Sequence, residues 1–163
     1  MAVIDTTRDP QALTLAITSQ LFAPPERAWE LWADRRQLER WWGPPGYPAT
    51  FLEHDFVPGG AARYVMTSPE GEKSAAWFRF RTIEPHTALE FDEGFGDVPD
   101  EAPPGMPPAM RLSARMAEAY GGTTMTITTT FASVEAMEQV LAMGMQQGLA
   151  LALWQADAIL AAG

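Results

Sequence analysis

The last thirty or so residues constrain the fold of this chain most. Ser133 is a suitable N-cap, Glu135 would lie in the first turn, and a helical pattern runs from there to about residue 161. Only an extended apolar surface, such as the concave face of a sheet, can cover so long a stripe. The stripe at helical spacing consists of Met137, Leu141, Met145, Leu149, Ala152, Ala156 and Ile159.

The segments before this helix predict two short helices and a series of strands. Residues 13–22 alternate apolar and polar side chains, as a half-buried strand does. Pro24 and Pro25 then open one helix, and a second helix over residues 35–41 ends before a Gly-Pro-Pro-Gly turn. Turns containing Gly or Pro separate the remaining strands, which we expect at 49–56, 61–67, 74–84, 87–93, 110–119 and 123–131.

This order of elements predicts an α+β architecture. A curved antiparallel sheet of about seven strands would surround the long C-terminal helix, with two short helices after the first strand. A chain of 163 residues fits one ordinary domain. We therefore assign residues 12–163 to a single domain and residues 1–11 to an N-terminal arm.

Composition excludes several classes of function. The chain has 21 acidic and 11 basic residues, a formal net charge of −10, so neither nucleic acid nor an anionic membrane is an expected partner. It has no cysteine, which excludes disulfides and thiolate chemistry. The first ten residues lack the order of an export signal, and no run of about 18 apolar residues occurs. We expect a cytoplasmic protein.

Several short motifs together resemble the START-like (SRPBCC) superfamily, and most closely the bacterial relatives of the heat-shock ATPase activator. The resemblance covers about residues 12–160. It implies a helix-grip fold with an apolar cavity between the sheet and the long helix, opening near the two short helices. Members include carriers, polyketide cyclases and dehydratases, and chaperone cofactors, so the fold does not choose among them. The motifs are Trp41-Trp42-Gly43-Pro44, the turn at Gly59-Gly60, Met66 to Gly71, Phe78 through Pro85, and Met143-Gly144 with Gly148.

The family pattern also suggests which strand residues face the cavity. For each of them, plain packing in the core is the alternative. Trp41 and Trp42 precede the turn where the mouth is expected, and either could contact a ligand or anchor the short helix. The predicted ligand-binding residues are Trp41, Trp42, Tyr64, Met66, Phe78, Phe80, Leu89, Phe91, Leu112, Gly144, Met145 and Gly148.

Two glycines within the C-terminal helix need a spatial reason. Gly144 and Gly148 would each cost about 1 kcal/mol relative to alanine. They could leave room for a ligand, allow close packing on the sheet, or mark a kink. An empty cavity of about 300 Å³ would cost roughly 7 kcal/mol, so side chains, water or a ligand must fill it. Nine methionines favour an adaptable filling.

The sequence does not support catalysis or a metal site. His54 and His86 are the only histidines, and they are too far apart in the pattern to predict metal binding. There is no Gly-x-Ser-x-Gly motif and no phosphate-binding glycine loop. Asp92 and Glu93 could act as acid or base, but the acidic run around them is typical of a solvated face. We predict no catalytic residue, no metal and no cofactor, and expect outward salt bridges from Arg79 and Arg81.

The leading hypothesis is a non-catalytic protein that binds a small, largely apolar ligand. One alternative is an interaction protein that stimulates a chaperone ATPase through an acidic edge formed by Glu93, Asp97, Asp100 and Glu101. Another is an enzyme of the polyketide cyclase or dehydratase type. A second apolar stripe on the helix, together with the acidic Pro/Gly-rich loop 94–109, predicts a homodimer with Met143, Ala150 and Trp154 in the interface.

Overall fold

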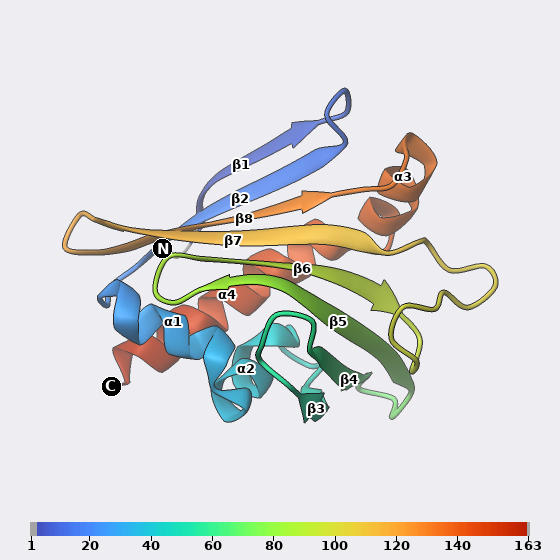
Figure 1. The fold of residues 1–163 in the computed structure, drawn as a ribbon, viewed down its shortest axis with the longest axis horizontal. Coiled ribbons are helices and arrows are strands. Elements are labelled where there is room, and N and C mark those ends of the chain that lie inside the picture. Colours follow the sequence, from blue (N-terminus) through green and yellow to red (C-terminus); the bar gives the residue numbers. More distant parts are fainter. Residues whose placement is uncertain (1–2, 163) are drawn as a thin grey trace.

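A computed structural model describes residues 3–162 of the chain (Figure 1). In chain order its elements are β1 Val3–Asp9, β2 Thr14–Leu21, α1 Pro25–Ala33, α2 Arg35–Trp42, β3 Ala49–His54, β4 Ala61–Thr67, β5 Lys73–Glu84, β6 Ala88–Phe95, β7 Met110–Ala119, β8 Gly122–Thr130, α3 Val134–Ala142 and α4 Met145–Ala161.

All the strands form one curved antiparallel sheet, in the order β1-β2-β8-β7-β6-β5-β4-β3. The sheet has eight strands rather than about seven, because the segment expected to be an arm forms β1. Arg8 of β1 lies opposite Leu15 of β2, and Asp9 lies opposite Thr14. From Ile4 to Asp9 the strand is exposed on both faces, so it lacks the alternation by which a half-buried strand is recognised.

The helices cover one face of the sheet. Figure 1 shows α4 crossing this face, and α1 and α2 pack against α4. The apolar residues expected on α1 are those it buries: Ala28, Trp29, Leu31 and Trp32. A helix gripped by a curved antiparallel sheet in this way is the helix-grip arrangement. Within residues 3–162, no helix combines the length and apolar character needed to cross a membrane.

The C-terminal helical segment is broken, so the prediction of one continuous helix was wrong. The Ser133 hydroxyl caps α3 by accepting a hydrogen bond from the Ala136 amide at 3.1 Å. Gly144 then adopts φ +89°, a left-handed conformation that favours glycine and ends a helix. The apolar stripe continues through this position, which is why periodicity alone predicts a single helix.

The end of the sheet covered by α1 and α2 is filled with aromatic side chains, which we call the aromatic core. Its rings make edge and tilted contacts, with centroids 4.9 Å apart for Trp32 and Trp41 and 4.3 Å apart for Phe78 and Phe91. Its members are Trp32, Trp41, Phe78, Phe80 and Phe91, all fully buried.

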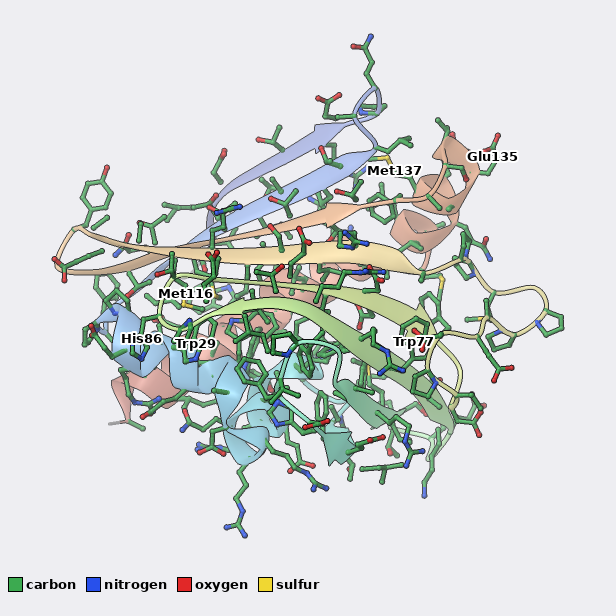
Figure 2. The ribbon with its side chains drawn as sticks, viewed as in Figure 1. Trp29, Trp77, His86, Met116, Glu135 and Met137 are labelled. Atoms are coloured by element: carbon green, nitrogen blue, oxygen red, sulfur yellow. The ribbon has the colours of Figure 1, made fainter. Side chains whose placement is uncertain are left out.

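Two side-chain contacts involve the turn after β5 and the outer face of the sheet. Figure 2 shows His86 beside Trp29, and their ring centroids are 6.3 Å apart. Trp77 lies on the opposite face from Phe78 and donates a hydrogen bond to the Glu101 carbonyl at 3.2 Å. The Pro/Gly-rich loop is therefore tied to the outer face of the sheet (Figure 2).

Candidate functional site

A cavity of about 460 Å³ lies between the start of α4 and the sheet, beyond the aromatic core. Its walls come from β4 to β7, the loop after α2, and the junction of α3 and α4. Three lining residues are about half exposed and form what we call the rim: Tyr47, Met143 and Leu151. This volume falls in the range typical of small-molecule sites.

Seven of the residues predicted to bind a ligand line this cavity: Trp42, Tyr64, Met66, Leu112, Gly144, Met145 and Gly148. Another five are packed in the core and do not line it: Trp41, Phe78, Phe80, Leu89 and Phe91. The prediction selected these residues by parity, which identifies the inward face of a strand but not the position along it. The residues at one end of that face are covered by α2. For example, Trp42 packs edge-on against Phe78, with ring centroids 5.2 Å apart.

The structure adds lining residues that the sequence analysis did not select. Most are apolar and come from the loop after α2, from β5 to β7, and from the helices: Pro44, Pro45, Tyr47, Ser74, Ala75, Ala76, Glu93, Gly94, Phe95, Met110, Val140, Met143, Leu149 and Leu151. Met143 had been placed in a dimer interface. Its position on the rim gives it a second set of neighbours.

Glu93 is the important omission. Alternate strand residues share a face, so Glu93 points the same way as Phe91, into the domain. The charged neighbours of Glu93 predicted a solvated acidic face, and for Glu93 that prediction was wrong. Asp92 does lie on the outer face, where Arg111 pairs with it and the Arg81 Nε donates to its carboxylate at 2.7 Å. The alternation of inward and outward residues along β6 was the signal that could have placed Glu93 in the cavity.

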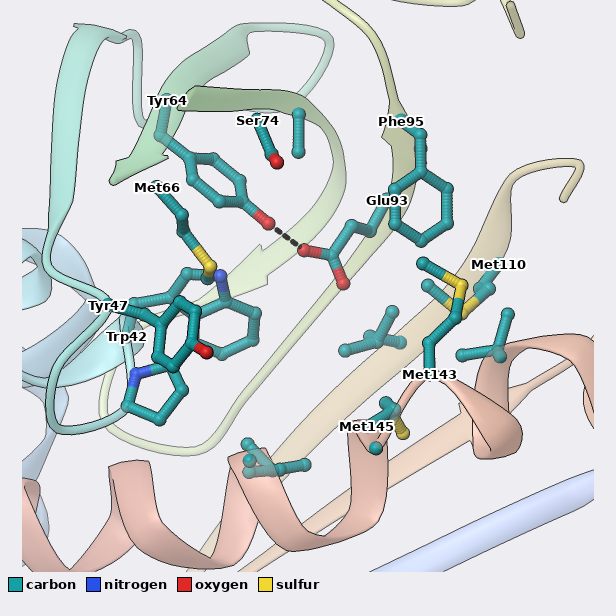
Figure 3. A pocket seen from close by; sticks show the side chains of 18 of the residues that line it. Trp42, Tyr47, Tyr64, Met66, Ser74, Glu93, Phe95, Met110, Met143 and Met145 are labelled. Carbon is teal, nitrogen blue, oxygen red and sulfur yellow. Dashed lines mark hydrogen bonds between the residues drawn. The ribbon is translucent and has the colours of Figure 1, made fainter. Parts of the chain in front are cut away.

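Tyr64 holds the carboxylate of Glu93 in the cavity. Its hydroxyl donates a hydrogen bond to the Glu93 Oε2 atom, as the dashed line in Figure 3 marks. The Tyr64 ring is itself fixed by stacking on Phe51, with centroids 4.9 Å apart and an angle of 26° between the planes. The side chain of Glu93 is only partly exposed and lines the cavity.

This environment alters the acidity of both groups. Burial raises the pKa of the Glu93 carboxyl from 4.5 to about 7, although hydrogen bonding to Tyr64 and, more weakly, to Trp42 opposes the shift. Burial and the negative charge of Glu93 raise the pKa of the Tyr64 hydroxyl well above its usual value. Tyr64 therefore remains a proton donor, while Glu93 changes charge near neutral pH.

The charged groups nearby have other partners. None of the described residues that line the cavity is a Lys, Arg or His. The outward salt bridges predicted for Arg79 and Arg81 are confirmed: Arg79 pairs with Asp100 at 2.6 Å, and Arg81 pairs with Asp92.

His54 contacts the Trp32 carbonyl at 3.1 Å, and burial lowers its pKa. Across residues 3–162, no three His, Cys, Asp or Glu side chains come together as a metal site would require.

The loop after α2 forms one wall of the cavity because α4 holds it. Gln155 of α4 donates a hydrogen bond to the Gly43 carbonyl at 2.6 Å. Two turns nearer the start of α4, Gly148 faces Pro44, and an added Cβ would lie 3.7 Å from the proline ring. At that distance the added Cβ would make an ordinary van der Waals contact, so close packing does not require a glycine at position 148. Its missing side chain enlarges the cavity instead.

The apolar face predicted as a dimer interface is only partly exposed. Met143 and Trp154 are about half exposed, whereas Ala150 is partly covered. Leu151 extends the same face to the rim of the cavity. A role for these residues in dimerisation stays a prediction.

Comparison with solved structures gives close relatives over nearly the whole chain. Protein Ms6760 from Mycobacterium smegmatis has a TM-score of 0.88 and 40% sequence identity, and 96% of each chain is covered. A protein from Arthrobacter aurescens has a TM-score of 0.92 and 42% identity, covering 99% of this chain and 93% of that one. A protein from Chromobacterium violaceum, at 24% identity and a TM-score of 0.79, shares the fold, covering 91% of this chain and 96% of its own.

Among curated proteins, no match to the chain is found. Residues 22–161 match the family described as "Activator of Hsp90 ATPase homolog 1-like protein". This match spans both short helices, the cavity and α4, and it confirms the resemblance stated from the sequence motifs. The chain belongs to this family, the Activator of Hsp90 ATPase homolog 1-like proteins.

Proposed function

We propose that this protein binds a small, largely apolar molecule in the cavity beside α4. The cavity volume of about 460 Å³ carries the proposal. The cavity opens to solvent at Tyr47, Met143 and Leu151, so an apolar molecule could enter it and cover its apolar walls from water. Water would be poorly held by walls that offer few polar partners. An apolar ligand satisfies these walls better than water does.

The composition of the walls supports a ligand of variable shape. Met66, Met110, Met143 and Met145 all line the cavity. Methionine side chains are flexible and polarisable, so they adapt to different apolar surfaces. Figure 3 shows Met66 on one side of the cavity and Met110, Met143 and Met145 on the other.

Filling the cavity tests the proposal. Ser74 lines it from the exposed end of β5, so Ser74→Trp should occupy the space with little cost to folding. Lys73→Trp is the matched control, because the neighbouring residue on a strand points to the opposite face. The probe is the neutral dye N-phenyl-1-naphthylamine, titrated by fluorescence. We expect saturable binding by the wild type, about tenfold weaker binding by Ser74→Trp, and unchanged binding by Lys73→Trp.

Two results would count against a binding protein of this kind. One is the absence of saturable dye binding by the wild-type chain. The other is equal binding by Ser74→Trp and Lys73→Trp, which would place the dye elsewhere on the surface. Thermal denaturation of all three proteins checks that the variants are folded.

A second candidate function is acid–base catalysis of the cyclase or dehydratase type, and Glu93 is the observation that favours it. A carboxyl group with a pKa of about 7, facing a cavity, suits proton transfer at neutral pH. An enzyme of this type would lose about a hundredfold or more of its turnover in Glu93→Gln. Equal turnover by the variant would remove this candidate.

Stimulation of a chaperone ATPase remains a proposal that rests on the family. The acidic edge suggested for it is divided, because Glu93 faces the cavity and Asp100 pairs with Arg79. A homodimer through Met143, Ala150 and Trp154 is likewise a proposal. Sedimentation at micromolar concentration tests it: a mass of 17.9 kDa, that of one chain, would contradict pairing.

A further inference from the structure

We propose that the cavity selects apolar molecules that carry a positively charged amine, bound with the ammonium group against Glu93. This inference rests on the proposed binding function and specifies its ligand class. Glu93 lacks a basic partner among the described residues, aromatic rings flank it, and none of the described lining residues is basic.

The partners of Glu93 leave it without a counter-charge. On the outer face, the neighbouring Asp92 pairs with two guanidinium groups, those of Arg81 and Arg111. On the inner face, Glu93 receives a hydrogen bond from the neutral hydroxyl of Tyr64. No Lys, Arg or His in residues 3–162 forms an ion pair with it. A partly buried carboxylate of this kind is stabilised when a cation is brought to it.

Aromatic rings surround the same carboxylate. Figure 3 shows Glu93 between the rings of Tyr64 and Phe95, with Trp42 and Tyr47 further along the wall. All four rings line the cavity. The faces of aromatic rings attract cations, and aromatic cages in proteins bind quaternary ammonium groups through this attraction. The walls therefore favour an ammonium group in addition to an apolar body.

The charges of the lining residues disfavour anions. The cavity offers no basic side chain to a carboxylate or phosphate, and the chain as a whole carries a net charge of −10. An anionic ligand would bring a second negative charge close to Glu93, which is repulsive at short range. Fatty acids are thus poor candidates, although their chains would suit the walls. A cationic ligand is attracted both by Glu93 and by the field of the whole protein.

The test uses probes that share a naphthyl group and differ in charge. They are 2-(1-naphthyl)ethylamine, the neutral 2-(1-naphthyl)ethanol, and 1-naphthylacetate, each titrated into the full chain by calorimetry at about pH 8, where Glu93 is mainly ionised. We expect the amine to bind about tenfold more tightly than the alcohol, and the acetate to bind most weakly.

Variants then assign the preference to one carboxyl group. Glu93→Gln should weaken amine binding about tenfold and leave alcohol binding within about twofold. Glu90→Gln is the matched control, because Glu90 lies on β6 outside the cavity lining and pairs with Arg111. It removes the same charge from the same strand, so the amine preference should persist.

The outcomes separate this inference from the proposed function. Equal binding of amine and alcohol by the wild type, or an equal loss of both in Glu93→Gln, would overturn the amine inference while leaving apolar binding intact. Loss of the preference in Glu90→Gln would assign it to net charge and would also overturn the inference. If no probe binds, both the inference and the proposed function fail.

Discussion

The two ends of the concave face of the sheet share the same strands but differ in filling. On β5, Phe78 and Phe80 fill the end beneath α1 and α2, whereas Ser74 and Ala76 leave space at the end beside α3. On β6 the change is from Phe91 to Glu93. Residue size and polarity change within four residues of one strand. The cavity therefore results from the small and polar side chains at one end of these strands. Larger side chains at the same positions would fill it.

The helices reinforce this difference between the ends. The filled end is covered by α2 and the middle of α4, and the Trp41 indole donates a hydrogen bond to the Leu31 carbonyl at 2.8 Å. The other end is covered by the end of α3, the start of α4 and the loop held by Gln155. Because Gly144 separates α3 from α4, no continuous helix crosses this end.

Removing one large side chain from each end should give the largest contrast in stability. Phe91→Ala would open a new void in the aromatic core and is expected to cost about 4 kcal/mol. Met66→Ala would enlarge a space that already exists and should cost about 1 kcal/mol. Urea denaturation measures both free energies of unfolding. Equal losses would contradict the distinction between a filled and a hollow end.

The pH dependence of the free energy of unfolding should reveal the raised pKa of Glu93 at the hollow end. Its pKa is about 7 in the native protein against 4.5 ordinarily, so the native state holds a proton that the unfolded chain releases. The stability from protonated Glu93 is fully present below about pH 4.5 and is lost as pH rises towards 7, on the order of 3 kcal/mol in total.

The measurement compares wild type with Glu93→Gln by urea denaturation at about pH 5 and about pH 8. Because the glutamine does not titrate, the variant should gain stability relative to wild type as pH rises. A difference that is the same at both pH values would show that the native and unfolded states bind the Glu93 proton equally.

The two glycines at the hollow end should respond differently to alanine, with the smallest effects. Gly144→Ala places a side chain at φ +89° and should destabilise by about 1 kcal/mol. Gly148→Ala lies inside α4 with ordinary contact to Pro44, and should be neutral or stabilise by up to about 1 kcal/mol. Thermal melting checks the signs. Stabilisation by both variants would contradict a left-handed break between α3 and α4.

The succession of strands and short helices along the chain could be predicted, because turns and periodicity are local properties of the sequence. The strands expected at 61–67 and 110–119 have the bounds that the structure gives to β4 and β7. β1 could not be recognised, since nearly all of it is exposed. A break at Gly144 was only one of three interpretations of the helical glycines, because a positive φ leaves no mark on the apolar pattern that would favour it.

The candidate site could be predicted only in part, for a different reason. Parity identifies which residues face inward, but it does not say how far α2 extends over that face. Phe78 and Tyr64 therefore appeared equivalent, although Tyr64 lines the cavity and Phe78 does not. Glu93 obeys the same parity, and it was missed because charge was given more weight than strand geometry.

Met143 and Leu151 belong both to the outer apolar face of the C-terminal helices and to the rim of the cavity. A partner that covers this face, whether a second copy or another protein, would also cover the opening of the cavity. If the cavity binds a ligand as proposed, docking of a partner and exchange of the ligand would depend on each other through Met143 and Leu151, without a long-range change in shape.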